Sequence, residues 1–170
     1  FPDDMRKWHE YTDWMPFIPL ILFITLDKGK NLLQFLFLIG VVYVIRFIAF
    51  SITILPAPSV ICECEWETEP ETFLRRMLNI LYQEGCNDLL FSGHTSLMLM
   101  STLFLIHYCL DDSVIAKLFL IMYNILGIIL IIGTKLHYSV DVYLATIITT
   151  LLFFSFNNIR FYSETNSVNN

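Results

Sequence analysis

The amino-acid sequence predicts an all-α, polytopic transmembrane helix bundle, and three observations lead to this fold class. The 170 residues are 56% hydrophobic and only 15% charged, whereas soluble domains carry about 45–50% apolar and about 25% charged residues. Five apolar segments approach the length of about 17–25 residues that a helix needs to cross a bilayer. Their apolar residues cover the whole circumference of a helix, which is typical of segments embedded in lipid.

The five predicted spans are joined by short polar turns and one long loop. They cover, in order, about residues 13–26, 32–55, 95–110, 114–132 and 140–156. The first is the shortest and contains two prolines, so it spans the membrane only if it extends back toward His9. Residues 56–91 form the long polar loop, and residues 157–170 form a polar tail. We expect residues 1–170 to form a single membrane-embedded domain.

The charge pattern argues against a nucleic-acid partner. Ten Lys and Arg residues face sixteen Asp and Glu residues, which gives a net charge of −6. Binding to a phosphate backbone needs clustered cations, but here the basic residues form nothing larger than adjacent pairs. The Lys and Arg residues are also divided almost evenly between the two predicted sides of the membrane, so they leave the orientation open.

The cysteines do not predict a metal site. Cys62, Cys64 and Cys86 lie in the long loop, and Cys109 lies near the end of the third predicted span. Their spacing fits no standard structural zinc pattern. We therefore expect a disulfide or free thiols in the loop, with the pairing left open, and neither a metal ion nor a cofactor.

A possible anion site lies where the long loop meets the third predicted span. Ser92 is a natural N-cap residue, and Gly93 allows a ligand to approach the backbone closely. The backbone N–H groups at a helix start attract anions, phosphate above all. His94 follows directly, and therefore lies beside this predicted anion site.

A second histidine lies at the start of the fifth predicted span. His137 and Asp141 are four residues apart, so on a helix they share one face. A carboxylate there can fix the imidazole tautomer and stabilise the protonated ring. Because the spans alternate in direction, His94 and His137 are expected on the same side of the membrane. Two such imidazoles suit attack on the phosphorus of a lipid headgroup, with one as nucleophile and the other as general acid.

A plainer interpretation stands beside this one. Histidines at span ends are often only interfacial, and Asp141 could be a charge that faces a loop. A carboxylate inside a span is costly, however, which favours a functional role. Arg46 lies within the second predicted span. It could pair with a carboxylate, line a headgroup cavity or extend its charged end to the interface.

Three of these segments resemble motifs of the sphingomyelin synthase family. Residues 86–95 are similar to its C-G-D-x-x-x-S-G-H-T motif, with Asn87 in place of the glycine. Residues 137–142 are similar to its H-Y-[ST]-x-D-V motif, and residues 46–58 resemble its span that ends in T-x-L-P-x-P. The order and spacing agree over roughly residues 1–160.

The resemblance implies a fold and an activity. The family belongs to the type-2 phosphatidic acid phosphatase superfamily and has six spans, of which this chain would supply the last five, with the first span absent. Its members transfer a phospho-headgroup, phosphocholine or phosphoethanolamine, from a glycerophospholipid to ceramide and release diacylglycerol. Its partners would be membrane lipids. The protein would lie in the Golgi or plasma membrane, with its active site on the lumenal or extracellular side. The headgroup, the acyl preference and any homo-oligomer remain open.

The resemblance also implies roles for individual residues. His137 would be the nucleophile that becomes phosphohistidine, Asp141 its partner, and His94 the acid–base group. Asp88 would lie near the headgroup, as would the other predicted substrate-binding residues, which are Ser92, Gly93 and Arg46.

Two other functions use the same features. A lipid phosphate phosphatase would pass the phosphoryl group to water, and a non-catalytic relative would only bind lipid. Phosphatases of the superfamily carry an Arg-Pro dipeptide, which this sequence lacks, and an arginine at the position that Ile131 occupies. A phosphomonoester dianion needs more fixed positive charge than a phosphodiester, so the missing cations favour a diester substrate.

Overall fold

The structure is a computed structural model that describes residues 11–52, 91–110, 113–134 and 139–168. All regular elements within these ranges are helices, which confirms the predicted all-α fold class. The elements are α2 (Phe17–Asp27), α3 (Leu32–Ile52), α5 (Gly93–Phe104), the π-helix η1 (Leu105–Cys109), α6 (Val114–Gly133) and α7 (Ser139–Val168). The predicted long loop lies almost wholly outside the described residues.

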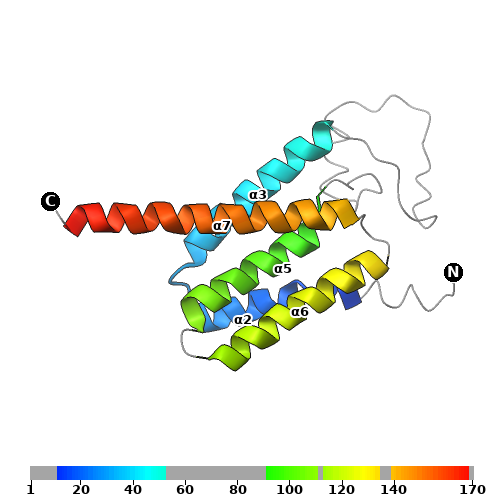
Figure 1. The fold of residues 1–170 in the computed structure, drawn as a ribbon, viewed down its shortest axis with the longest axis horizontal. Helices are drawn as coiled ribbons and strands as arrows, with labels where there is room; N and C mark the ends of the chain where they lie inside the picture. Colours follow the sequence, from blue (N-terminus) through cyan, green and yellow to red (C-terminus); the bar gives the residue numbers. More distant parts are fainter. Residues whose placement is uncertain (1–10, 53–90, 111–112, 135–138, 169–170) are drawn as a thin grey trace.

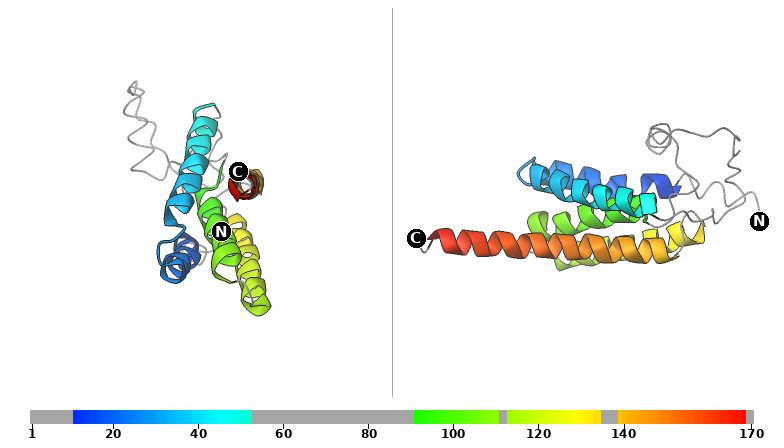
Figure 2. Two further views of the ribbon diagram at one scale, coloured as in Figure 1. Left: turned by 90° about the vertical axis from the view of Figure 1, so that its left-hand side faces the viewer. Right: turned by 90° about the horizontal axis from the view of Figure 1, so that it is seen from above.

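Helix α5 lies at the centre of the bundle and contacts each of the other α-helices. Figure 2 shows α2 and α3 on one side of α5, and α6 and α7 on the other. Helices α2, α5 and α7 begin at the same end of the bundle, where α3 and α6 finish (Figure 1). We call this the histidine end, because α5 begins there at Gly93 and carries His94 in its first turn. The predicted alternation of the spans is therefore confirmed for the described helices.

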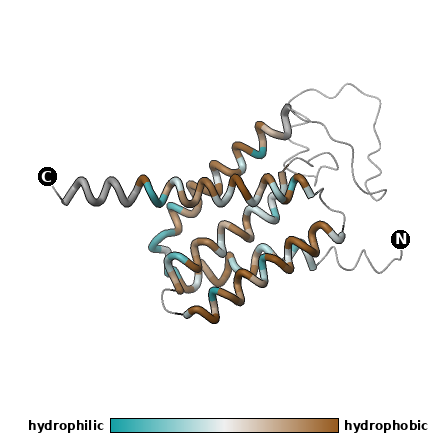
Figure 3. The backbone as a smooth tube through the Cα atoms, in the orientation of Figure 1, coloured by the Kyte–Doolittle hydropathy of each residue, from teal (hydrophilic) through white to brown (hydrophobic). Residues whose placement is uncertain are grey.

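Three of the described helices are long and apolar enough to cross a membrane. The candidate spans are Leu32–Ala49, Val114–Gly133 and Ser139–Ile159. Hydrophobic residues predominate along them (Figure 3), and many of their large apolar side chains are exposed, with Leu33 and Ile115 each 82% exposed. Since such a surface requires lipid around it, the chain is a multi-pass membrane protein.

Of the other two predicted spans, only the first is shorter than expected. Helix α2 has 11 residues. Helix α5 has 12 and continues without a break into the five residues of η1, so together they cover the third predicted span. The prolines explain where α2 begins. Pro16 is its N-cap residue, and Pro19 lies in its first turn, where a missing backbone N–H removes no hydrogen bond. A separate helical turn, residues 11–14, precedes α2.

Packed phenylalanines hold together the opposite end of the bundle, which we call the aromatic end. The ring of Phe104 on α5 contacts Phe23 on α2, Phe35 on α3 and Phe153 on α7, with centroid separations of 5.3, 5.3 and 5.4 Å. All three pairs meet edge to face, the arrangement that aromatic rings prefer. All four side chains are buried, so they connect four helices at one point.

A tight turn joins α2 to α3 at the aromatic end. The buried Asp27 carboxylate accepts hydrogen bonds from the backbone N–H and the side-chain amide of Asn31, at 2.6 and 2.7 Å. Lys28 and Gly29 take positive φ angles of 51° and 81°, which lets the chain reverse within a few residues. This turn ends one helix and begins the next.

The π-helix η1 lies directly beyond the phenylalanine cluster. Within it, the hydroxyl of Tyr108 donates a hydrogen bond to Oδ1 of Asn157 on α7 at 2.7 Å. The side-chain amide of Gln34 on α3 donates to the Tyr108 hydroxyl at 2.9 Å and to the same Asn157 oxygen at 3.3 Å. These polar contacts connect α3, η1 and α7. Helix α7 continues to Val168 through polar residues, since no Pro or Gly interrupts it.

Candidate active site

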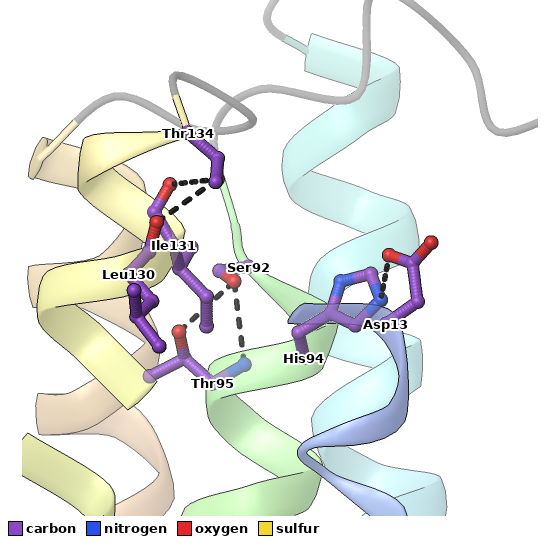
Figure 4. Close-up of polar contacts among 7 residues, drawn as sticks. All are labelled: Asp13, Ser92, His94, Thr95, Leu130, Ile131 and Thr134. Carbon is purple, nitrogen blue, oxygen red and sulfur yellow. Dashed lines mark hydrogen bonds and ion pairs between the residues drawn. The ribbon is translucent and has the colours of Figure 1, made fainter. Parts of the chain in front are cut away.

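Ser92 caps the start of α5, as the sequence predicts. Its Oγ accepts a hydrogen bond from the backbone N–H of Thr95 at 3.3 Å and lies 3.0 Å from the Thr95 hydroxyl (Figure 4). The Ser96 hydroxyl donates to the backbone carbonyl of Ser92 at 3.0 Å. All three side chains are buried. The cap fixes the direction in which the loop joins the helix, and the first turn presents its backbone N–H groups at this end.

Arg46 reaches this helix start from α3. A side chain at Gly93 would collide with the guanidinium group, because a Cβ atom there would lie 3.1 Å from Cζ of Arg46. It would also lie 3.6 Å from the Tyr43 hydroxyl, on the same helix as Arg46. The Arg46 guanidinium carbon is in turn 5.7 Å from the centre of the Tyr43 ring, within range of a cation–π contact. The absence of a side chain at Gly93 thus lets a cation lie against the first turn of α5.

His94 lies in the same turn and contacts a carboxylate. Its Nε2 atom lies 3.5 Å from Oδ1 of Asp13, in the helical turn that precedes α2 (Figure 4). The two side chains are 31% and 33% exposed, so a ligand can reach both. Sequence analysis did not predict this contact of Asp13. The position of Asp13 at the start of a predicted span, on the same side of the membrane as His94, was the feature that could have indicated it.

Asp141 brings the start of α7 to the same place. It lies in the first turn of α7 and is fully buried. Its backbone carbonyl accepts a hydrogen bond from the backbone N–H of Ser92 at 3.4 Å, so the start of α7 and the cap of α5 are in direct contact. The sequence predicted that these two segments would meet at one end of the bundle, and the described residues confirm this.

Two predicted site residues, Asp88 and His137, lie outside the described residues, and so do Cys62, Cys64 and Cys86. Their roles therefore stay predictions. In the described part of the chain, no group of three His, Cys, Asp or Glu side chains is placed to hold a metal ion. What the structure brings together at the histidine end is one imidazole, two carboxylates, one guanidinium group and the start of a helix.

Known proteins share the sequence of this region. Residues 85–159 match the family model described as PAP2 superfamily C-terminal. The chain is 32% identical over 130 residues to phosphatidylcholine:ceramide cholinephosphotransferase 2 of Rattus norvegicus, which covers 70% of the chain and 36% of the relative. It is 29% identical over 128 residues to sphingomyelin synthase-related 1 of Caenorhabditis elegans, covering 68% of the chain and 26% of the relative.

A human relative gives a longer alignment. Phosphatidylcholine:ceramide cholinephosphotransferase 1 of Homo sapiens is 28% identical over 149 residues, which covers 78% of the chain and 35% of the relative. The chain thus spans about a third of the length of the curated relatives that it matches. The residues matched by the family model, 85–159, include α5, α6 and most of α7, and with them His94, His137 and Asp141.

Proposed function

Because this chain belongs to the sphingomyelin synthase family, we propose that it transfers a phospho-headgroup from a glycerophospholipid to ceramide and releases diacylglycerol. The names of the rat and human relatives favour phosphocholine as the headgroup and phosphatidylcholine as the donor. Phosphoethanolamine is the alternative headgroup. We further propose, from the family resemblance, that the histidine end lies on the lumenal or extracellular side of a Golgi or plasma membrane.

The observation that carries this proposal is the position of Arg46. A cation beside a helix N-terminus is the reverse of the usual arrangement, in which negative charges lie there. A phosphate group bound beside Arg46 at the first turn of α5 would be attracted by both the guanidinium group and the backbone N–H groups. Gly93 provides the space that lets the guanidinium group lie against this turn. The site therefore suits a phosphodiester, which carries one negative charge.

The proposed reaction has two steps. In the first, a ring nitrogen of His137 attacks the phosphorus, forming a P–N bond, while the P–O bond to diacylglycerol breaks and His94 gives a proton to the leaving oxygen. In the second, His94 takes the proton from the primary hydroxyl of ceramide, whose oxygen attacks the same phosphorus and releases His137. Asp141 would stabilise the positive charge on His137 and keep its ring oriented.

The test is a transfer assay in lipid. The purified protein is placed in vesicles with ceramide and with phosphatidylcholine labelled in its phosphocholine group. We expect labelled sphingomyelin and an equal amount of diacylglycerol, and we expect His137→Ala to abolish both while the melting temperature stays unchanged. The matched control is His107→Phe, an exposed histidine at the aromatic end, which keeps a ring at this position and should retain activity.

Three results would contradict the proposal. Label in free phosphate or phosphocholine alone would identify water as the acceptor and the protein as a hydrolase. A complete lack of phospholipid turnover would favour a non-catalytic relative that binds lipid. Full activity in His137→Ala would remove that residue from the role of nucleophile. Repeating the assay with phosphatidylethanolamine as donor identifies the headgroup.

A further inference from the structure

Asp13 supplies a negative charge to the candidate active site from a segment that lies outside both histidine motifs. It belongs to the helical turn of residues 11–14, which precedes α2. From there its Oδ1 atom comes within 3.5 Å of Nε2 of His94. The two residues are 81 positions apart in the sequence, so only the packing of α2 against α5 brings them together.

We propose that Asp13 is a positioning residue for His94: its carboxylate holds the imidazole ring in place and stabilises the protonated form of that ring. This inference rests on the proposed function, in which His94 is the acid–base group. It assigns to this chain a second carboxylate–imidazole pair, in addition to the pair predicted for Asp141 and His137. Asp13 would act through His94 and would not touch the substrate.

The charges around His94 show why a carboxylate is needed there. Helix α3 brings the Arg46 guanidinium group against Gly93, the residue before His94, together with the Tyr43 hydroxyl. The N-terminus of α5 adds a partial positive charge. Both positive charges disfavour a protonated imidazole. A general acid must carry its proton when it meets the leaving oxygen, so this environment would work against the first step.

Carboxylates counter that effect from the other helices. Asp13 contacts the ring from the side of α2, and the buried Asp141 lies at the start of α7, next to the Ser92 cap. Helix α6, the remaining neighbour of α5, has no charged residue in its last turn. Of the two carboxylates, Asp13 is the one in an ion-pair contact with His94. Among the described residues, it is therefore the group best placed to keep this imidazole protonated.

The partial exposure of the pair indicates a role in the reaction more than in stability. Each side chain is about one-third exposed, although the Oδ1 atom of Asp13 that contacts His94 is itself buried. Ion pairs between partly exposed side chains contribute little to folding because solvent screens them. The same exposure leaves His94 open to a headgroup at the membrane surface. The loss of Asp13 should therefore change when His94 gives and takes its proton, while the helix bundle stays intact.

The experiment compares Asp13→Asn with the wild-type chain and with Trp14→Phe, a conservative change at the next residue, whose side chain is 70% exposed. The protein, labelled with ¹⁵N-histidine, is titrated in lipid nanodiscs, and the His94 signals are identified by their loss in His94→Gln. We expect the midpoint of the His94 titration to fall by about 0.5–1 pH unit in Asp13→Asn. It should stay unchanged in Trp14→Phe and be largely restored in Asp13→Glu.

Activity gives the second measurement. The alkaline limb of the kcat/KM profile should move to lower pH in Asp13→Asn by the same amount as the titration midpoint, because the first step needs protonated His94. Coincident His94 titrations for Asp13→Asn and wild type would overturn the proposal. So would an unmoved alkaline limb in an active enzyme. If wild-type protein transfers no headgroup at any pH, the proposed function fails, and the titration still decides whether Asp13 governs His94.

Discussion

The two ends of the helix bundle use opposite kinds of side chain around the same central helix. At the aromatic end, α5 contributes Phe104 to a cluster of large buried rings. At the histidine end, it contributes Ser92, Gly93 and His94, next to a guanidinium group and two carboxylates. Since lipid tails are as apolar as the side chains, shape and close contact drive helix association in a membrane. The comparison indicates that the aromatic end holds the bundle together and the histidine end carries the chemistry.

Between the two ends, the central helix α5 contains small polar residues. The hydroxyl groups of Ser96 and Ser101 donate hydrogen bonds to backbone carbonyls of their own helix, at 3.0 and 2.8 Å. Such residues satisfy their polar groups locally, and their small size lets neighbouring helices approach closely. The central helix can therefore carry five polar side chains among its twelve residues without needing water along its length.

The largest effect on stability is expected from Phe104→Ala, which breaks the aromatic end. The substitution removes four ring contacts at once, those with Phe23, Phe35, Tyr108 and Phe153. It also leaves a cavity, so the free energy of unfolding should fall by about 3 kcal/mol. The matched control is Phe119→Ala on α6, whose side chain is 69% exposed and faces outward. Thermal melting in detergent measures both variants. Equal losses in the two would mean that the phenylalanine cluster does not hold the bundle together.

A smaller effect, confined to activity, is expected from Gly93→Ala at the histidine end. The added methyl group would displace the Arg46 guanidinium group, so kcat/KM should fall about tenfold, which corresponds to about 1.4 kcal/mol of transition-state stabilisation. Gly40→Ala is the control, because a Cβ atom there meets nothing within 4 Å. The melting temperature should not fall in either variant, and it can rise in Gly40→Ala because alanine favours a helix interior over glycine. Undiminished activity in Gly93→Ala would show that the contact between Arg46 and α5 is dispensable.

The smallest effect is expected between the two ends, where the amide of Asn124 on α6 donates to the Thr102 hydroxyl on α5 at 2.7 Å. Interhelical hydrogen bonds in membranes contribute about 0.6 kcal/mol on average. Asn124→Ala and Thr102→Val should each destabilise the bundle slightly, and the double variant should lose less than the sum of the two. A double-mutant cycle measures this coupling. Strictly additive losses would mean that the bond contributes nothing.

Local sequence patterns were sufficient to predict much of this fold. Apolar runs of helical length identified the helices, and the order of the spans placed the starts of α5 and α7 at one end. The N-cap role of Ser92 was also predictable, because capping depends on residues within a single turn. The shortness of α2 was partly indicated by Pro16 and Pro19, whose effect on a helix is local as well.

The contacts of the site depend on residues far apart in the chain, and these were not predictable. Gly93 indicated a close approach, but nothing near it in the sequence showed that Arg46 would be the approaching group. Asp13 looked like one polar residue among many at the edge of a span, because the partner that gives it meaning is His94. The roles of Asp88 and His137 stay predictions. The π-helix was also missed, since residues 105–109 carry no local signal for it.

That π-helix leaves room for one change in the length of the chain. A π turn hydrogen-bonds residues five apart, and therefore contains one more residue than an α turn. Losing one residue just before Tyr108 would let an ordinary α turn form there, and because the two kinds of turn cover nearly the same rotation, the Tyr108 hydroxyl would still face Gln34 and Asn157. Deleting a residue from the α-helical part of α5 would instead rotate Tyr108 about the axis by roughly 100° and turn its hydroxyl away from both partners.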